Sequence, residues 1–467
     1  MSIDFKISDF FYPVSLLKLK SFFDKSQWFS PEEMKAYQEK RLRQIVLHAV
    51  QNVPYYRELF ENLHLKAEDI RSLEDLKQIP ILTKETLASQ FQRLQALNRA
   101  RYRPQVLHTS GTTGRQLAFL EDRHSNVLEF VYYWRSWGWA GYRLGDRFAS
   151  FASPYFMKHF DQAKPVNHAF KRALGWLLLS GLSLSYEKID GYTDLMRRYK
   201  IKFLQGMPSE LYYFSLFLRE RKIKDLHFKA VFSAGEILLP YQRKTIESVL
   251  KSPVYDAYGH MERTVAISEC PARSLHVHSD YGILERVDIK PAGADKNLKM
   301  ASILGTTLYN FSMPLLRYDV GDNVEFEEEA ESCVCGRGLP VVKRIAGRRN
   351  DVIVTPEGQI IPCLFLVFDE APNIVMGQFV QEEVESLRIR IVRSPAYTTE
   401  NETELLANVR KFTGSKIRLY VEYTDTEELM AYSPGKFQVM VSKLGKEFSS
   451  EAMDPSEYSG AVLDQVL

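Results

Sequence analysis

A dense run of small and hydroxylated residues, Thr109-Ser110-Gly111-Thr112-Thr113-Gly114, stands between two strand-like runs of the chain. Glycine lets backbone N–H groups approach an anion closely, and hydroxyl side chains add hydrogen-bond donors. The run is therefore suited to cradling phosphate groups, although a surface hairpin explains the same composition equally well. It is not a Walker A loop, because Arg115 and Gln116 follow it where that loop has Lys and Ser or Thr.

Polar or small residues also follow three predicted strands in the middle of the chain. Strands are predicted at 201–205, 228–232 and 254–257, and helices lie between them from Pro208 and from Tyr241. Alternation of strands and helices is typical of a parallel sheet built from βαβ units. Ligands of such sheets bind outside the carboxyl ends of the strands. We therefore expect the segments 206–209, 233–236 and 256–262 to converge at one edge.

Composition narrows the class of protein. The chain has 467 residues, with 61 basic and 59 acidic side chains and a formal charge of +2. This balance excludes a protein held to nucleic acid by bulk charge. No apolar run approaches the ~20 residues that a spanning helix needs, and the N-terminus lacks the pattern of a signal peptide. Four cysteines make a disulfide scaffold unexpected, so we predict a cytoplasmic protein.

The elements that must position these residues form an α/β protein of two domains. Residues 1–349 are predicted to form a large domain with a helical layer at 1–100, which includes a helix near 73–77, a parallel sheet, and a strand-rich part after Val265. Residues 350–467 carry their own turn signals, strands at 387–392 and 417–423 and a helix at 402–412, which indicates a small, mobile α+β domain. The polar junction near Asn350 is the expected hinge.

Five segments, in order along the chain, resemble the motifs of the adenylate-forming superfamily of acyl-CoA synthetases. They are the 109–114 run, Asp256-Ala257-Tyr258-Gly259-His260-Met261-Glu262, Arg317-Tyr318-Asp319-Val320-Gly321-Asp322, Gly347-Arg348-Arg349-Asn350-Asp351, and Ser433-Pro434-Gly435-Lys436-Phe437. Together with the N-terminal stretch ending at 52–57, they are similar to the phenylacetate–CoA ligase and CapK-like branch. Agreement of five ordered motifs is far more specific than any one of them.

The resemblance implies a role for each residue. The 109–114 loop would hold the β- and γ-phosphates of ATP, and Glu262 would bind Mg²⁺. Asp322 would accept hydrogen bonds from the ribose hydroxyls. Lys436 would stabilise charge as the carboxylate attacks, so the implied catalytic residues are Lys436, Glu262 and Arg348. The implied nucleotide-binding residues outside the loop are Gly235, Glu236, Asp256, Tyr258, Gly259, Asp322 and Arg348. Of these, Gly235 and Glu236 would line the adenine pocket.

The acyl pocket is the least specified part of the site. Aromatic side chains and residues at strand ends are candidates for its walls and floor, and a plain core strip is an equal alternative. If they line a pocket, an aryl or apolar acid is favoured over a charged one. The candidates are Tyr155, Phe156, Gly206, Met207 and Ala234.

Cysteine and histidine residues form a separate candidate metal site. Cys270, His276, Cys333 and Cys335 are the preferred set, with His278 as the alternative to His276. Thiolates with an imidazole suit a closed, structural Zn²⁺ site. The alternative is a group of inert thiols and solvent-exposed histidines, and some members of the branch that the chain resembles carry zinc at corresponding cysteines.

The resemblance predicts that the chain activates a carboxylic acid with ATP and transfers the acyl group to coenzyme A. Transfer to an amine or a hydroxyl, in capsular polysaccharide or natural-product synthesis, is the second hypothesis. A non-catalytic nucleotide-binding scaffold is the third, and the presence of Glu262, Asp322 and Lys436 argues against it. The sequence does not specify the acid, the oligomeric state or the pathway.

Overall fold

We describe a computed structural model of the chain. The described residues are 12–108, 117–152, 168–171, 175–180, 186–292, 297–328, 332–348, 353–357, 360–361, 364–369, 371–431 and 437–444. Among the helices of these segments, none has an apolar stretch that would reach across a bilayer. The mixed α/β fold confirms the predicted class.

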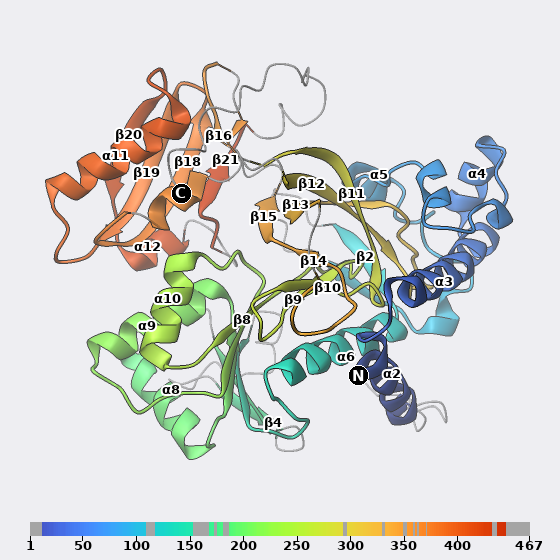
Figure 1. The fold of residues 1–467 in the computed structure, drawn as a ribbon, viewed down its shortest axis with the longest axis horizontal. Helices are drawn as coiled ribbons and strands as arrows, with labels where there is room; N and C mark the ends of the chain where they lie inside the picture. The colour runs from blue at the N-terminus through green and yellow to red at the C-terminus, as the bar shows by residue number, and fades with distance from the viewer. Residues whose placement is uncertain are drawn as a thin grey trace.

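Helices at the N-terminus form the predicted layer, which lies at the right of Figure 1. Ser30 and Glu33 form a reciprocal capping box at the start of the longest helix, and Pro54 starts the next one after Val53. The helix predicted near 73–77 is only a short 3₁₀ turn. The helices are α2 (Tyr12–Ser26), α3 (Pro31–Asn52), α4 (Pro54–Asn62), α5 (Lys84–Ser89), η1 (Ala67–Asp69), η2 (Asp75–Gln78) and η3 (Arg99–Tyr102).

A buried ion pair ties this layer to the rest of the large domain. Arg135, on α6 (Arg123–Trp139), donates from Nη2 to Asp280 Oδ1 at 2.9 Å and from Nη1 to the Phe23 carbonyl at 3.0 Å. Both charged side chains are almost fully buried. A buried charge is tolerated only when it is paired and hydrogen-bonded, so this contact fixes α2 against α6.

The main sheet has nine strands in the order β14-β10-β9-β8-β7-β6-β3-β5-β4, and its central strands run parallel as predicted. Helices α8 (Tyr186–Arg198), α9 (Pro208–Glu220) and α10 (Pro240–Leu250) connect or flank these strands. The strands are β3 (Phe148–Ala152), β4 (His168–Lys171), β5 (Trp176–Ser180), β6 (Phe203–Gly206), β7 (Ala230–Ala234), β8 (Val254–Gly259), β9 (Ala266–Glu269), β10 (Leu275–Val277) and β14 (Val341–Val342).

A second, antiparallel sheet carries the segment that resembles the ribose motif. It has the order β11-β12-β13-β15, formed by β11 (Gly282–Pro291), β12 (Leu298–Thr307), β13 (Tyr318–Glu327) and β15 (Arg344–Arg348). The hairpin of β1 (Gln105–His108) and β2 (Ala118–Glu121) flanks the 109–114 run. That run lies outside the described residues, so its predicted role as a phosphate loop stays a prediction.

The C-terminal residues form a mixed four-stranded sheet with its own apolar core, drawn in orange and red in Figure 1. The helix and strands predicted at 402–412, 387–392 and 417–423 are all present. The elements are β16 (Ile353–Val354), β17 (Ile360–Ile361), η5 (Leu364–Asp369), β18 (Ile374–Glu383), β19 (Ser386–Arg393), α11 (Thr399–Thr413), β20 (Arg418–Tyr423), α12 (Thr426–Ala431) and β21 (Met440–Ser442). The boundary and the hinge at Asn350 stay predictions, because 349–352 lie outside the described residues.

The two sheets meet closely at the loop after β8. A Cβ atom on Gly282 would lie 1.9 Å from the Thr264 carbonyl oxygen, so the first residue of β11 must lack a side chain. The same loop carries Glu262. Close packing there therefore sets the position of a candidate site residue.

We expect Gly282→Ala to lower the free energy of unfolding by about 2–3 kcal/mol, the cost of overpacking a core. Denaturant unfolding measures it. Gly138→Ala is the matched control, because nothing lies within 4 Å of a Cβ atom there and alanine favours a helix by up to about 1 kcal/mol. Equal destabilisation by both substitutions would contradict the close approach.

Candidate active site

Two tyrosine–carboxylate hydrogen bonds join the sheets at the candidate site. Tyr258, on β8, donates from Oη to Asp322 Oδ2 on β13 at 2.6 Å. Tyr318, the first residue of β13, donates from Oη to Glu262 Oε1 at 2.7 Å. The segments that resemble the adenine and ribose motifs therefore lie side by side, although 56 residues or more separate the bonded partners in sequence.

Glu262 is held in its charged form. Its buried carboxylate accepts a hydrogen bond from His260 Nδ1 at 3.0 Å. The Val265 N–H donates to His260 Nε2 at 3.2 Å, so the neutral imidazole carries its proton on Nδ1. Burial alone raises the pKa of Glu262, but the hydrogen bonds that His260 and Tyr318 donate to its carboxylate outweigh burial and lower the pKa below its usual value. Each oxygen keeps a lone pair, and an anionic oxygen ligand suits Mg²⁺.

Asp256 differs from Glu262 because its pKa is raised and not lowered. Its carboxylate accepts a hydrogen bond from the Ser233 hydroxyl on the neighbouring strand. Its backbone N–H donates to Glu269 Oε2 at 2.8 Å, and Arg243 pairs with the same Glu269 oxygen at 2.8 Å. Burial raises the pKa of Asp256 to about 7, although the Ser233 bond and the charge of Arg243 oppose it. This acid is therefore available in both protonation states near neutral pH.

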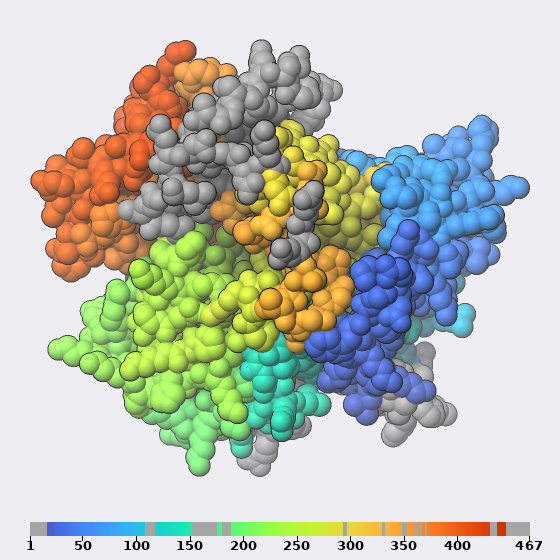
Figure 2. Space-filling model, in the orientation of Figure 1, coloured from blue at the N-terminus to red at the C-terminus, as the bar shows by residue number. Residues whose placement is uncertain are grey.

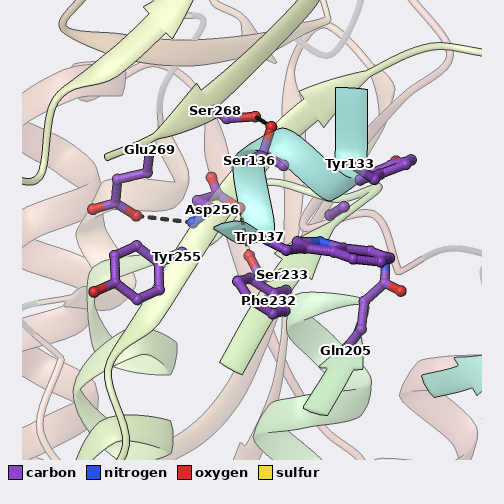
Figure 3. Close-up of a pocket in the computed structure, with 12 residues that line it drawn as sticks. Tyr133, Ser136, Trp137, Gln205, Phe232, Ser233, Tyr255, Asp256, Ser268 and Glu269 are labelled. Carbon is purple, nitrogen blue, oxygen red and sulfur yellow. Dashed lines mark hydrogen bonds between the residues drawn. The ribbon is translucent and has the colours of Figure 1, made fainter. Parts of the chain in front are cut away.

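A small cavity lies between α6 and the ends of strands β6–β9, as Figure 3 shows. Its volume of about 10 Å³ is close to the space that one water molecule needs. Aromatic rings of α6 and β7 face polar groups from β6 and β9 across it. The lining residues are Tyr133, Ser136, Trp137, Gln205, Phe232, Ser233, Ala234, Tyr255, Asp256, Ala257, Ser268 and Glu269.

Of the predicted pocket residues that the structure describes, Gly206, Met207 and Ala234, only Ala234 lines this cavity. A Cβ atom on Gly206 would lie 2.9 Å from the Phe151 ring and 3.2 Å from Glu210 Oε2, so Gly206 allows close packing next to the cavity. The Met207 N–H donates to Glu210 Oε2 at 2.8 Å, which caps α9. Tyr155 and Phe156 lie outside the described residues.

The remaining predicted nucleotide residues lie around the ends of β7, β8 and β15. Gly235 follows β7 with φ of 96°, a conformation that favours glycine. Glu236 accepts backbone hydrogen bonds from Ser209 and Phe437. Gly259 ends β8, and the backbone of Arg348 pairs with Asp322. Lys436 and Asn350 lie outside the described residues, so their roles stay predictions.

The sequence did not single out four side chains that take part in this geometry. His260 and Tyr318 stand inside the quoted motifs but had no assigned role, although they fix Glu262. Gln205 and Trp137 line the cavity. Gln205 directly precedes the predicted strand end at Gly206, and this position could have indicated that it belongs to the site. No feature of the sequence indicated Trp137, which lies on α6.

The four predicted metal ligands come together. The ligand atoms of Cys270, His276, Cys333 and Cys335 all lie within 4.8 Å of one another. The Cys270 and Cys333 sulfurs are 3.7 Å apart, close to the spacing expected between two thiolates on one tetrahedral zinc with Zn–S bonds of about 2.3 Å. His276 Nδ1 bonds to the Leu339 carbonyl at 2.9 Å, which leaves Nε2 for a metal. His278 instead contacts Arg135.

These features define the class of the protein: a large domain of two sheets that meet at a polar site, with a small α+β C-terminal part. No family model matches the chain. Protein CapK of Staphylococcus aureus is 22% identical over 396 residues, which cover 83% of this chain and 85% of CapK. Phenylacetate-coenzyme A ligase of Thermus thermophilus is 25% identical over 338 residues, or 71% and 74% of the two chains.

Solved structures share the fold. 2-Hydroxyisobutyryl-CoA ligase in its postadenylation state, in complex with 2-HIB-AMP, has a TM-score of 0.69 at 19% identity and covers 91% of this chain and 94% of its own. The same ligase in its thioesterification state has a TM-score of 0.55 at 18% identity, and the match covers 90% of this chain and 92% of the ligase chain. The curated relatives confirm the resemblance to the adenylate-forming superfamily, in its phenylacetate–CoA ligase and CapK-like branch, and the solved ligase structures share the fold.

The raised pKa of Asp256 predicts the pH dependence of stability. A buried acid of this kind favours the protonated folded state, so its contribution is lost as pH rises from about 4 through about 7. Asp256→Asn stays neutral and keeps an acceptor for Ser233. We expect this variant to gain up to about 4 kcal/mol over the wild type between pH 4 and pH 8, measured by denaturant unfolding. Parallel pH profiles would contradict the assignment.

Proposed function

We propose that the chain activates a carboxylic acid with ATP to form an acyl-adenylate and pyrophosphate, and then transfers the acyl group to coenzyme A. The observation that supports this most is the pair of tyrosine bonds that brings Asp322 and Glu262 to one edge of the two sheets. A ribose-binding carboxylate and a magnesium-binding carboxylate have to be neighbours to hold one nucleoside triphosphate.

Each residue has a physical task in this proposal. Asp322 accepts from the ribose hydroxyls, and the Tyr258 hydroxyl fixes the orientation of its carboxylate. Mg²⁺, held by Glu262 with phosphate oxygens, would neutralise charge on the departing pyrophosphate. The 109–114 loop binds phosphate oxygens through its backbone N–H groups. Arg348 adds a cationic fork near the ribose, and Lys436 stabilises the charge that builds at the α-phosphate.

The acyl group is proposed to lie beside Ala234, at the edge of this cavity and not inside it, because the cavity has room for only about one water molecule. Tyr133, Trp137 and Phe232 supply aromatic surface there, which favours an aryl or apolar acid. Gln205 adds an amide at the same place, so a small acid with one polar substituent also fits the chemistry.

The second candidate is transfer to an amine or a hydroxyl acceptor. The similarity to CapK covers more of this chain than the similarity to phenylacetate-coenzyme A ligase does, which is the observation that favours it. Both candidates share the adenylation step and differ only in the acceptor.

Zn²⁺ is proposed to occupy the site of Cys270, His276, Cys333 and Cys335. Four protein ligands leave no open coordination position, so the metal would be structural. It would join the loop after β9 to the 333–335 segment.

Pyrophosphate exchange tests the first step. With a panel of aryl and alkyl acids, we expect exchange that depends on the acid and on Mg²⁺, and a loss of about 10²–10³-fold in Lys436→Ala with ATP binding retained. Lys443→Ala is the matched control, because Lys443 pairs with Glu382 at the surface and should leave exchange unchanged. Full exchange in Lys436→Ala would show that this lysine is misassigned.

Trapping with hydroxylamine should report the acyl-adenylate for either acceptor. Acyl-CoA formation would then separate the two candidates, since the second predicts none. Absence of both exchange and trapping across the panel would leave only the scaffold hypothesis.

Metal removal tests the zinc site. We expect stoichiometric zinc by elemental analysis of metal-replete protein, and a lower thermal midpoint after chelation, because metal affinity contributes to folding. Cys335→Ser should lose the metal, whereas Cys363→Ser, at the cysteine outside the predicted set, should keep it. Zinc-free protein with an unchanged midpoint would remove the proposal.

A further inference from the structure

Helix α9 is the surface on which the C-terminal domain rests. Tyr212 Oη donates to the Val375 carbonyl at 2.6 Å, and Tyr213 Oη donates to the Thr426 carbonyl at 3.3 Å. Phe437 is buried and belongs to the same apolar cluster as the α9 side chains. In Figure 2 the orange-red C-terminal residues lie against the green residues of this region. The contact is therefore a packed interface with directional hydrogen bonds.

One carboxylate bridges this interface. Glu236, two residues after β7, accepts the Ser209 N–H through Oε2 at 3.0 Å and the Phe437 N–H through Oε1 at 2.8 Å. Ser209 lies in the first turn of α9, where N–H groups lack partners within the helix and a negative charge is favoured. One oxygen is thus anchored to the large domain, and the other holds the backbone of the C-terminal domain.

Phe437 directly follows Lys436 in the sequence. Consecutive Cα atoms are only about 3.8 Å apart in any chain, so a bond that fixes the backbone of one residue limits how far the preceding residue can move. A side chain that must stabilise charge at a reacting phosphate acts only when it is held in place. Glu236 is suited to supply that restraint without touching the substrate.

We propose that Glu236 is a positioning residue for the adenylation step: its carboxylate bridge holds the backbone of Phe437, the residue that follows Lys436 in the sequence, against the large domain. The inference rests on the proposed function. It assigns the Glu236 carboxylate to the domain contact, where the resemblance implied a place in the adenine pocket.

The domain arrangement supports a role in this step alone. The chain superposes better on 2-hydroxyisobutyryl-CoA ligase in the postadenylation state than on the same ligase in the thioesterification state, at nearly equal coverage. A bridge between two domains exists only in one of their relative orientations. Acyl transfer, which follows a change of orientation, should therefore not need the Glu236 bridge.

Glu236→Gln tests the proposal by separating the two half-reactions. Glutamine offers one acceptor oxygen for two N–H donors, so we expect pyrophosphate exchange to fall by about tenfold or more. The KM for ATP and the rate of acyl transfer from isolated acyl-adenylate should stay unchanged. Glu210→Gln is the matched control on α9: Glu210 accepts the Met207 N–H of its own domain, and its variant should show no such split.

Equal loss in both half-reactions would overturn the proposal, and so would a rise in the KM for ATP with unchanged exchange at saturation. The second result would return Glu236 to the adenine pocket. If Glu236→Gln does not fold, Glu236→Asp serves instead, because it keeps the charge but is one methylene too short to reach both N–H groups.

Hydrogen exchange at the Phe437 amide tests the bridge without any catalysis. We expect this amide to exchange about tenfold faster or more in Glu236→Gln than in the wild type and in Glu210→Gln. Unchanged protection would overturn the bridge. Faster exchange in a protein that adenylates no acid would instead keep the bridge and reject the proposed function.

Discussion

The two tyrosine–carboxylate hydrogen bonds are the constraint on which the site depends. A neutral hydroxyl that donates to a charged carboxylate forms a strong, short bond, and burial from water strengthens it further. Tyr258 reaches from the nine-stranded sheet to Asp322, and Tyr318 reaches back from the four-stranded sheet to Glu262. Each sheet supplies one of the two tyrosine donors, so the bonds run in opposite directions between the sheets. A shift of either sheet would therefore break at least one bond.

Burial affects the acids of this region in opposite ways. Glu262 stays charged because His260 and Tyr318 donate to it. At Asp256 and Glu210 burial outweighs the single bonds from Ser233 and Met207 and raises the pKa to about 7 and about 8. A site that contains acids with different pKa values can keep one carboxylate charged while another gains and loses a proton. Hydrogen-bond donors, and not burial as such, decide which acid carries the charge.

The contact between α9 and the C-terminal part of the chain would suit the change of domain orientation that the proposed function involves. It combines Tyr212 and Tyr213, which donate to backbone carbonyls, with the buried ring of Phe437 and the Glu236 carboxylate. Interfaces between domains of one chain resemble transient protein–protein contacts, and relative motion is expected across them. Backbone acceptors and donors suit this purpose, because rotation exposes groups that water can satisfy.

The sequence by itself determined the α/β class, the parallel strands near 203–259, and the three cysteines and two candidate histidines of the Cys/His cluster, because hydrophobic periodicity and residue type are local signals. It also pointed to Glu262 and Asp322 through motif resemblance. It failed at 73–77, where apolar spacing suggested a helix and a short 3₁₀ turn forms, and it left His276 and His278 unresolved. Only the tertiary structure decided that His276 faces the cysteines while His278 faces Arg135, and that Glu236 contacts Phe437. Such pairings depend on the register and packing of elements up to 201 residues apart, which no local pattern encodes.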